Sequence, residues 1–271
     1  MMKGPSWFNV TSMVFGFTFL YLPILLLVIF SFNESRLVTV WGGFSTKWYV
    51  ELLENDQLLA AAWVTAKVAF ISASIATVFG TMAAIVLARA GRFWGRSMFS
   101  GMIFAPLVMP EVILGLSLLL LFVAIDQSRG FWTVIIAHTT FAMCYVAVVV
   151  QSRLVGFDRS IEEAAEDLGC PPLKTFFLIT LPIILPGVVA GWMLAFTLSL
   201  DDLVIASFTT GPGATTLPMK IYSQVRLGVT PEINAACTVL IAVVTGGVIA
   251  ASIATKRRQS QHEADEFAAA G

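Results

Sequence analysis

The chain has 271 residues, of which 58% are hydrophobic and 12% are charged, and its mean hydropathy is +0.86. Soluble domains are about 45–50% apolar and about 25% charged, so the composition indicates a membrane protein and excludes an ordinary soluble domain. The formal charge of −1 gives no reason to expect a nucleic-acid partner, and the scattered cysteines and the two distant histidines, His138 and His262, predict neither a disulfide framework nor a zinc site.

Six apolar stretches are long enough to cross a bilayer, since a spanning helix needs about 20 apolar residues. The first is too long for a removable signal peptide and lacks a small-residue cleavage site, so we expect it to be retained. The aromatic residues that follow it are placed as an interfacial belt would be: Trp41, Trp48 and Tyr49. The predicted fold is therefore an all-α integral membrane protein with transmembrane helices at about 12–32, 61–88, 98–125, 132–151, 183–208 and 234–255.

The third apolar stretch contains two prolines and a carboxylate. Pro106 and Pro110 remove backbone donors and are expected to break or kink the helix. Glu111 follows the second proline, and a carboxylate at membrane depth is costly unless it faces water or a partner. Glu111 is thus either part of a substrate pathway or a residue at a break near the membrane surface.

Lysine and arginine are distributed unequally between the two sides of the membrane. Ten lie on one side and six on the other, and the larger group is expected to be cytoplasmic. Both termini are then cytoplasmic, and so is the polar segment around Glu163. The ten are Lys3, Arg89, Arg92, Arg96, Arg153, Arg159, Lys174, Lys256, Arg257 and Arg258, and the six are Arg36, Lys47, Lys67, Arg129, Lys220 and Arg226.

The polar segment between the fourth and fifth stretches predicts two short helices joined by an elbow. An acidic, helix-favouring run ends at Gly169, because glycine accepts the positive φ of a helix C-terminus. Pro171 and Pro172 suit the start of a second helix, expected over Leu173 to Ile179. Two helices held this way form a projecting knob, which suits docking to a partner better than catalysis.

Glu163 in this segment has two interpretations. Ser160 followed three residues later by Glu163 is the pattern of a capping box, in which both side chains satisfy N–H groups at the start of a helix. The alternative is an acidic contact to a basic residue of a partner. Both roles are compatible, since a cap could orient the knob.

Asp201 and Asp202 interrupt the fifth apolar stretch. The 18 residues from Ile183 to Leu200 make about 27 Å of helix, which places the two carboxylates near the outer membrane boundary. They are either a wetted helix end or the cation-attracting mouth of a translocation path, since a bound cation would relieve their mutual repulsion.

Other features near the fifth stretch are open to two interpretations each. Gly187 and Gly191 form a G-x-x-x-G pattern, which allows close helix packing within the chain or against a second subunit. Trp192, Phe196 and Tyr222 could contact a cation through their rings, although aromatic residues in membrane helices often only pack. The region beyond Thr209 predicts a short surface helix that includes Leu217, Ile221 and Val225.

The segment from Glu163 to Pro182 reads Glu-Ala-Ala, three residues, Gly169, nine residues, Ile179, one residue, Leu181-Pro182. It resembles, at every defining position, the coupling loop of permease subunits in ABC-type importers. Other segments are similar to the putrescine and spermidine/putrescine branch of that family, above all to the second permeases of putrescine importers: Val38–Trp41, Ala105–Pro110, Ser199–Phe208, Gly211–Pro218 and Pro231–Ala235.

This resemblance implies the fold of a type I importer permease in the bacterial inner membrane. It implies as partners a second homologous permease, two ATPase subunits and a periplasmic polyamine-binding protein. The coupling role falls on Glu163, Ala164, Ala165, Gly169, Leu173 and Phe176. From the chemistry of a cationic substrate, the candidate pathway residues are Asp201, Asp202, Glu111, Trp192 and Tyr222.

The chain lacks the G-x-x-x-x-G-K-[ST] phosphate loop, so we expect ATP and Mg²⁺ to bind the partner ATPase and this chain to be no enzyme. We expect a single transmembrane domain over 1–255, with the coupling loop at about 152–181 and a polar tail over 256–271. Alternative functions are a permease for another small solute, an ion-gradient-driven transporter, for which no internal repeat is seen, and a non-transporting scaffold or sensor.

Overall fold

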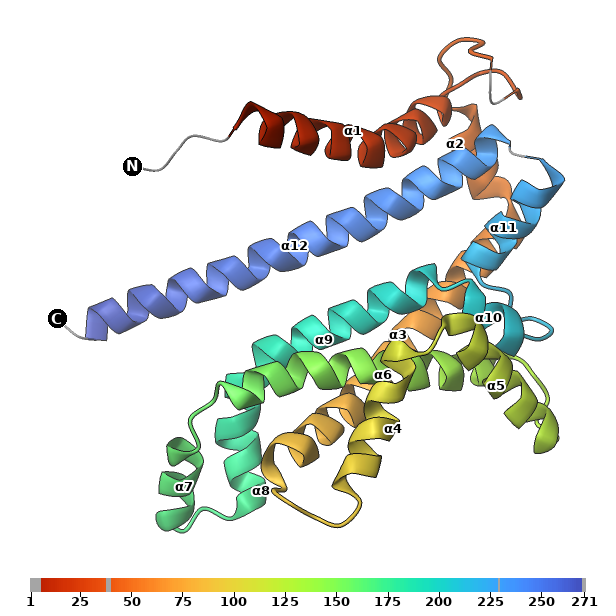
Figure 1. Cartoon of the computed structure of the whole chain (residues 1–271). Coiled ribbons are helices and arrows are strands. Elements are labelled where there is room, and N and C mark those ends of the chain that lie inside the picture. The colour runs from red at the N-terminus through yellow and green to blue at the C-terminus, as the bar shows by residue number, and fades with distance from the viewer. Residues whose placement is uncertain (1–5, 38–39, 229, 270–271) are drawn as a thin grey trace. The chain divides into compact units, whose positions relative to one another are not determined.

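The computed structural model describes residues 6–37, 40–228 and 230–269, with the side chains of 250–251 and 254–269 left undescribed. Lys3, residues 38–39 within the polyamine-like segments, and the side chains of Lys256 to Arg258 and of His262 therefore lie outside the described set. The described chain is helical and has no strand beyond an isolated bridge between Asn33 and Phe44. Its helices are α1 Trp7–Phe30, α2 Lys47–Glu54, α3 Asp56–Arg89, α4 Arg96–Val108, α5 Glu111–Ala124, α6 Phe131–Val155, α7 Ser160–Asp167, α8 Pro172–Thr175, the π-helix η1 Phe176–Thr180, α9 Leu181–Asp201, α10 Val204–Thr209, α11 Leu217–Leu227 and α12 Pro231–Ala269 (Figure 1).

Among the described residues, five helices are long and apolar enough to cross a membrane: α1, α3, α6, the continuous stretch Pro172–Asp201, and Pro231–Ile249 of α12. A sixth span is formed if α4 and α5 are taken together, although they meet at a bend of 116°. Pro106 lies inside α4 and Pro110 precedes α5, so the predicted break in the third apolar stretch is confirmed. α12 continues as a helix beyond the expected end of its span at residue 255.

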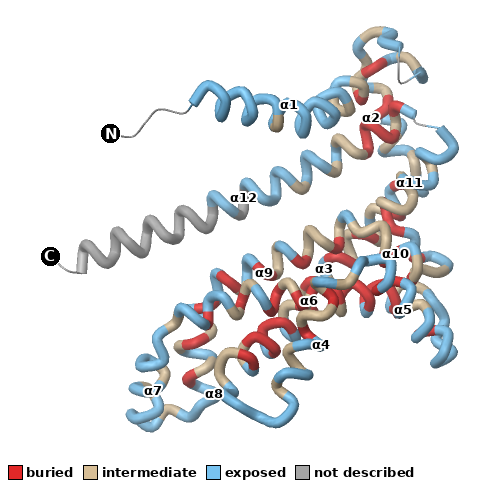
Figure 2. Tube along the Cα trace, in the orientation of Figure 1, coloured by how far each residue is buried: buried red, intermediate tan, exposed pale blue. Residues whose placement is uncertain are grey.

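The chain divides into two compact units, and the larger comprises residues 60–220. Its centre is α6, which packs against α4, α9 and α10. Small residues on α3 and α9, such as Ala76 and Ala195, allow both helices to approach Val146 and Val150 of α6. Figure 2 shows the buried residues concentrated along α6 and the helices around it.

Gly187 and Gly191 are part of this packing. A Cβ atom on Gly191 would lie 3.2 Å from Val146 Cγ1, and one on Gly187 would meet the side chain of Arg153, also on α6. Both glycines are buried within the unit. The G-x-x-x-G pattern therefore serves packing between α9 and α6 of the same chain.

The smaller unit comprises residues 1–59 and 221–271. In it α12 packs against α1 and α2, and Asn55 Nδ2 donates to Glu232 Oε1 at 2.7 Å. The residues of α1 are largely exposed, and an apolar surface of this kind is stable in hydrocarbon. Trp48 was predicted to lie in an interfacial belt, but it is buried and donates to the Asn33 carbonyl at 2.6 Å.

The fifth predicted span, 183–208, is wrong at both ends. At its start, α8, η1 and α9 form one continuous helix from Pro172. At its end, α9 stops at Asp201 because Asp202 is extended, with ψ of 121°, and a separate short helix, α10, begins at Val204. The carboxylate of Asp202 accepts the N–H groups of Ile205 and Ala206, which starts the new helix.

Candidate functional site

The elbow predicted at Gly169 is present. Gly169 has a φ of +86°, and its N–H donates to the Glu166 carbonyl at 2.8 Å. The N–H of Cys170 reaches back to the Ala165 carbonyl at 3.0 Å, so the last carbonyls of α7 are satisfied by the turn. A Cβ atom on Gly169 would meet nothing within 4 Å, which leaves backbone conformation as the reason for a glycine here.

The capping box predicted at Ser160 and Glu163 is wrong. Ser160 is already inside α7, and the residue before it, Arg159, makes no side-chain cap hydrogen bond. Instead, Asp158 Oδ1 accepts the Ser160 N–H at 3.0 Å, and this hydrogen bond holds the pKa of the Asp158 carboxyl below its ordinary value. The Glu163 side chain is exposed and has no partner among the described residues, which leaves the partner-contact interpretation standing.

The segment after the elbow differs from the predicted separate helix over Leu173 to Ile179. α8 and η1 lead without a stop into α9, so the second arm of the knob is the root of a membrane span. In Figure 1, α7 lies beside α8 at one end of this unit. Pro182 lies in the first turn of α9, and the wider π turn before it accommodates a proline ring that would otherwise clash with the Leu178 carbonyl.

The knob exposes apolar side chains. Leu168 at the elbow is 90% exposed and Leu173 is 73% exposed, while Ala165 and Phe176 are half-buried. Glu163 and Ala164 are exposed on α7. Exposure of leucine side chains to water is unfavourable, and a partner protein that covers them would remove this cost. The surface therefore has the composition of a docking site.

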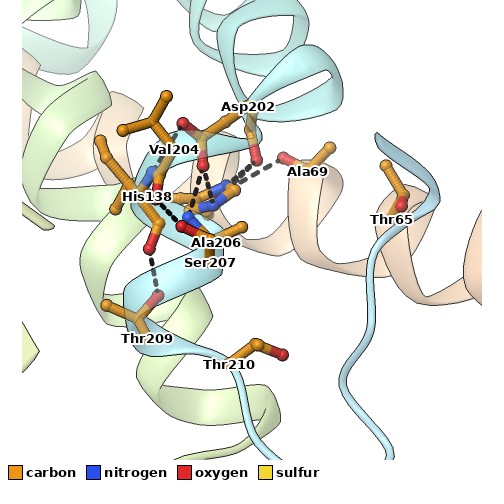
Figure 3. A network of polar contacts seen from close by, with 12 residues as sticks. Thr65, Ala69, His138, Asp202, Val204, Ala206, Ser207, Thr209 and Thr210 are labelled. Atoms are coloured by element: carbon orange, nitrogen blue, oxygen red, sulfur yellow. Dashed lines mark hydrogen bonds and ion pairs between the residues drawn. The ribbon is translucent and has the colours of Figure 1, made fainter. Parts of the chain in front are cut away.

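Asp201 and Asp202 do not form a pair of similar residues. The Asp202 side chain is 6% exposed, and its Oδ2 lies 3.0 Å from Nε2 of His138, which is 2% exposed. Figure 3 shows the two side chains turned toward one another, beside the start of α10. Asp202 is therefore neither a wetted helix end nor an exposed mouth that could attract a cation, whereas Asp201 at the end of α9 is exposed.

A chain of polar contacts continues from His138 across three helices. Its Nδ1 lies 2.6 Å from Ser199 Oγ on α9, and Ser199 Oγ lies 3.1 Å from Ser72 Oγ on α3. All these side chains are buried. The polar network of Ser72, His138, Ser199 and Asp202 therefore joins α3, α6 and α9 at the point where α9 ends. Sequence reasoning missed the role of His138, because its partners lie more than 60 residues away.

The other candidate pathway residues are placed differently. Glu111 is exposed in the first turn of α5, directly after the break. Trp192 is held in an aromatic cluster: its indole stacks on Phe196 at 5.2 Å, meets Phe70 edge-on at 5.8 Å, and donates to Ser74 Oγ at 3.2 Å.

Tyr222 belongs to the smaller unit, whereas the other candidate pathway residues belong to the larger one. One face of its ring already holds a cation of the same helix, because the guanidinium of Arg226 lies 4.7 Å from the ring centroid. Within the described residues, no three histidine, cysteine or acidic side chains are grouped as a metal site would require.

Comparison with known proteins finds a matching family and two similar permeases. The family model described as binding-protein-dependent transport system inner membrane component matches residues 76–258. The putrescine transport system permease protein PotI of Escherichia coli (strain K12) is 58% identical over 242 residues, which cover 87% of this chain and 86% of PotI. The spermidine/putrescine transport system permease protein PotC of the same strain is 43% identical over 249 residues, which cover 92% of this chain and 94% of PotC.

A solved structure shares the fold. It is a chain from the crystal structure of a bacterial ABC transporter involved in the import of the acidic polysaccharide alginate, with a TM-score of 0.70. The alignment covers 92% of this chain and 93% of that one, at 15% sequence identity. The predicted all-α permease fold is thereby confirmed, while the low identity carries no information on substrate.

Proposed function

Because the chain belongs to the family of binding-protein-dependent transport system inner membrane components, we propose that it is the permease subunit of an ATP-driven importer that moves putrescine and related polyamines across the bacterial inner membrane. One observation carries the substrate: the similarity to PotI extends over 87% of the chain. It is therefore not confined to the coupling loop, which permeases for unrelated solutes would share.

The importer requires further subunits. A second homologous permease would complete the membrane pathway, two ATPase subunits would bind ATP and Mg²⁺, and a periplasmic binding protein would deliver the polyamine. This chain binds neither ATP nor Mg²⁺ in the proposal, since its sequence has no phosphate loop. Both termini and α7 face the cytoplasm, in keeping with the distribution of lysine and arginine.

The ATPase contact consists of the Glu163–Ala164–Ala165 part of α7, the elbow at Gly169 and the residues after it. Glu163 and Ala164 present an exposed polar and small surface, and Leu173 supplies an apolar anchor. Ala165 and Phe176, both half-buried, form the floor between the two arms, and Gly169 sets the angle between them. An exposed acid and an exposed leucine on the same knob match a cleft that is basic at its rim and apolar at its base.

The substrate pathway is proposed to use Asp201 and, at the break in the third span, Glu111. A diamine carries two positive charges, so its path must be weakly negative and wet, yet must bind loosely enough to release. Asp201 is exposed and has no ion pair among the described residues, which leaves its charge available. Trp192, with Phe70 and Phe196, offers ring faces for a passing ammonium group.

Asp202 has a different role in the proposal. Its oxygens accept two N–H groups of α10 and contact His138, so the carboxylate holds the end of the span instead of meeting substrate. ATP binding would draw the two ATPases together and carry the α7 knobs with them. The spans would then rock from inward-open to outward-open while the binding protein releases its polyamine.

The test is uptake of labelled putrescine into vesicles that contain this chain with its partner permease and ATPase, with ATP on the ATPase side and loaded binding protein on the other. We expect ATP-dependent uptake that unlabelled spermidine inhibits and a neutral solute of similar size does not. If an ATPase assembles with the chain but no polyamine is taken up, the assignment of polyamine as the substrate is wrong. If no ATPase copurifies with the chain, the proposal that it is an importer permease is wrong.

A further inference from the structure

The acidic residue of α7 that faces the spans is Glu162, one position before the Glu-Ala-Ala sequence. Its Oε2 lies 3.2 Å from Arg89 Nη2, and its Oε1 accepts the hydroxyl of Thr180 at 2.6 Å. The Glu162 and Arg89 side chains are only 16% and 15% exposed. Both carboxylate oxygens are thus engaged, one at the end of α3 and one at the start of the fifth span.

Arg89 is itself held on two sides. It is the last residue of α3, and its guanidinium lies over the ring of Phe157, with 5.1 Å between Cζ and the ring centroid. Phe157 lies in the linker from α6 to α7. Arg89 therefore contacts the residue that leads into α7 as well as the first turn of α7.

The remaining acids of α7 take no part in this contact. Glu163, Glu166 and Asp167 are exposed, and within the described part of the chain Glu162 is the carboxylate in ion-pair range of Arg89. The Arg89 Nε and Nη2 atoms are shielded from solvent. Loss of the charge on Glu162 would leave a shielded guanidinium without its counter-charge, which is unfavourable.

The contact matters for how firmly α7 is held. Apart from it, α7 is joined to the spans by the turns at its two ends, by packing against α8 and η1, and by a hydrogen bond of 3.5 Å from Arg159 Nη2 to the Arg89 carbonyl. It has eight residues, with a short linker before it and the Gly169 elbow after it. Turns of this kind would absorb a displacement of α7. The Glu162 contacts bypass them, since they join α7 directly to the end of α3 and, through Thr180, to the start of α9.

We propose that Glu162 is a positioning residue that passes the displacement of α7 to two membrane spans at once. The proposal rests on the proposed function, because it takes α7 as the surface that the ATPase moves. Glu162 touches neither ATP nor substrate. Its effect is on how much transport each hydrolysis event produces.

The first experiment compares Glu162→Gln with Glu166→Gln in the reconstituted complex. Gln keeps the size of the side chain and removes its charge, and Glu166 is an exposed acid one turn along the same helix. The quantity measured is putrescine taken up per ATP hydrolysed. Glu162→Gln is expected to lower this ratio about fivefold or more, the lower end of ordinary coupling between sites, and Glu166→Gln to leave it unchanged.

Arg89→Gln supplies the partner variant. If the two residues act as one contact, Arg89→Gln combined with Glu162→Gln lowers the ratio no further than either single change. Additive losses would contradict the contact. A lower yield of assembled complex with an unchanged ratio per complex would show a merely structural role and would overturn the proposal.

A second measurement does not depend on the substrate. Spin labels at Glu166→Cys on α7 and at Arg92→Cys, exposed just beyond α3, report the distance between the two elements when Cys144, Cys170 and Cys237 are replaced by alanine. With Glu162 intact, we expect a narrow distance distribution that is the same with and without ATP. With Glu162→Gln, the distribution should broaden or shift with ATP.

The two measurements separate the two ideas. If the complex with unchanged Glu162 takes up no polyamine, the proposed function is contradicted. The distances between the spin labels still test whether the contact of Glu162 with Arg89 and Thr180 holds α7 to the spans. Equal distributions for Glu162 and Glu162→Gln, in both nucleotide states, would overturn the inference whatever the substrate.

Discussion

At Gly169 the direction of the chain depends on one backbone dihedral. A β-branched residue at a φ of +86° costs about 1–3 kcal/mol or rebuilds the turn. Gly169→Val should therefore abolish ATP-dependent uptake through misplacement of α7, while the subunits still assemble. The measurements are putrescine uptake in vesicles and the amount of ATPase that copurifies.

Gly156 provides the matched control for this variant. It follows α6 in the same segment between α6 and α9, but its φ is −83°, and a Cβ atom there would approach the Arg153 carbonyl only at 3.9 Å. Gly156→Ala should leave uptake near that of the unmodified complex. Normal coupling in Gly169→Val would refute the argument from the elbow.

His138 and Asp202 are buried together, so removing one side chain leaves the other as a buried polar group without its partner. His138→Ala leaves a buried carboxylate oxygen without its imidazole partner, and a buried polar group left unsatisfied typically costs about 1–3 kcal/mol. We expect a clear fall in the thermal unfolding midpoint of the detergent-purified complex. Adding Asp202→Asn should give less than the sum of the two single losses. Strict additivity would show that the two side chains are independent.

Asp201 should respond in the opposite way. It is exposed at the end of α9, so Asp201→Asn is expected to leave the unfolding midpoint unchanged. If it attracts the substrate, the variant should raise the KM for putrescine uptake about tenfold, which corresponds to a loss of about 1.4 kcal/mol. An unchanged KM and rate would remove Asp201 from the pathway.

At the scale of elements, the sequence predicted the features that depend on a few neighbouring residues. Glycine and proline patterns gave the elbow at Gly169 and the break between α4 and α5, because both depend on backbone dihedrals of a few residues. Hydropathy found the apolar helices, but not the end of α9 at Asp201. That end depends on Asp202, which starts α10 by accepting its N–H groups.

The contacts that sequence missed are all long-range. His138 meets Ser199 across 61 positions, and Arg89 meets Glu162 across 73, as their numbers show. No periodicity within one helix reports such pairs, because they depend on how helices pack. The continuous helix from Pro172 to Asp201 was missed for a related reason, since the π turn that accommodates Pro182 has no sequence signature.

Close packing of α3 on α6 gives a further test. A Cβ atom on Gly80 would lie 2.7 Å from the Met143 carbonyl and 2.7 Å from Val146 Cβ, so the helices must separate to admit it. Gly80→Ala should destabilise the complex by about 1–3 kcal/mol, measured as a lower thermal unfolding midpoint.

The control for Gly80 lies in α4. A Cβ atom on Gly101 would meet nothing within 4 Å, so Gly101→Ala should be neutral, or stabilising by up to about 1 kcal/mol through helix propensity. A midpoint for Gly80→Ala equal to that for Gly101→Ala would contradict the close approach of α3 and α6.

At the scale of the whole molecule, the chain is a multi-pass membrane protein of the permease family, as its composition and coupling-loop pattern predicted. The resemblance to polyamine permeases is confirmed by the relatives PotI and PotC. The roles of individual residues remain predictions. They converge on one arrangement, in which a cytoplasmic knob at one end of α9 is moved by ATP and an acid at its other end meets the substrate.

The most direct test of this arrangement is the ATPase rate of the complex in vesicles when the binding protein is supplied loaded with putrescine, loaded with spermidine, or empty. We predict that a polyamine-loaded binding protein stimulates hydrolysis well above the empty one, and that Gly169→Val removes the stimulation. An assembled complex whose ATPase rate is the same with loaded and empty binding protein would contradict the account.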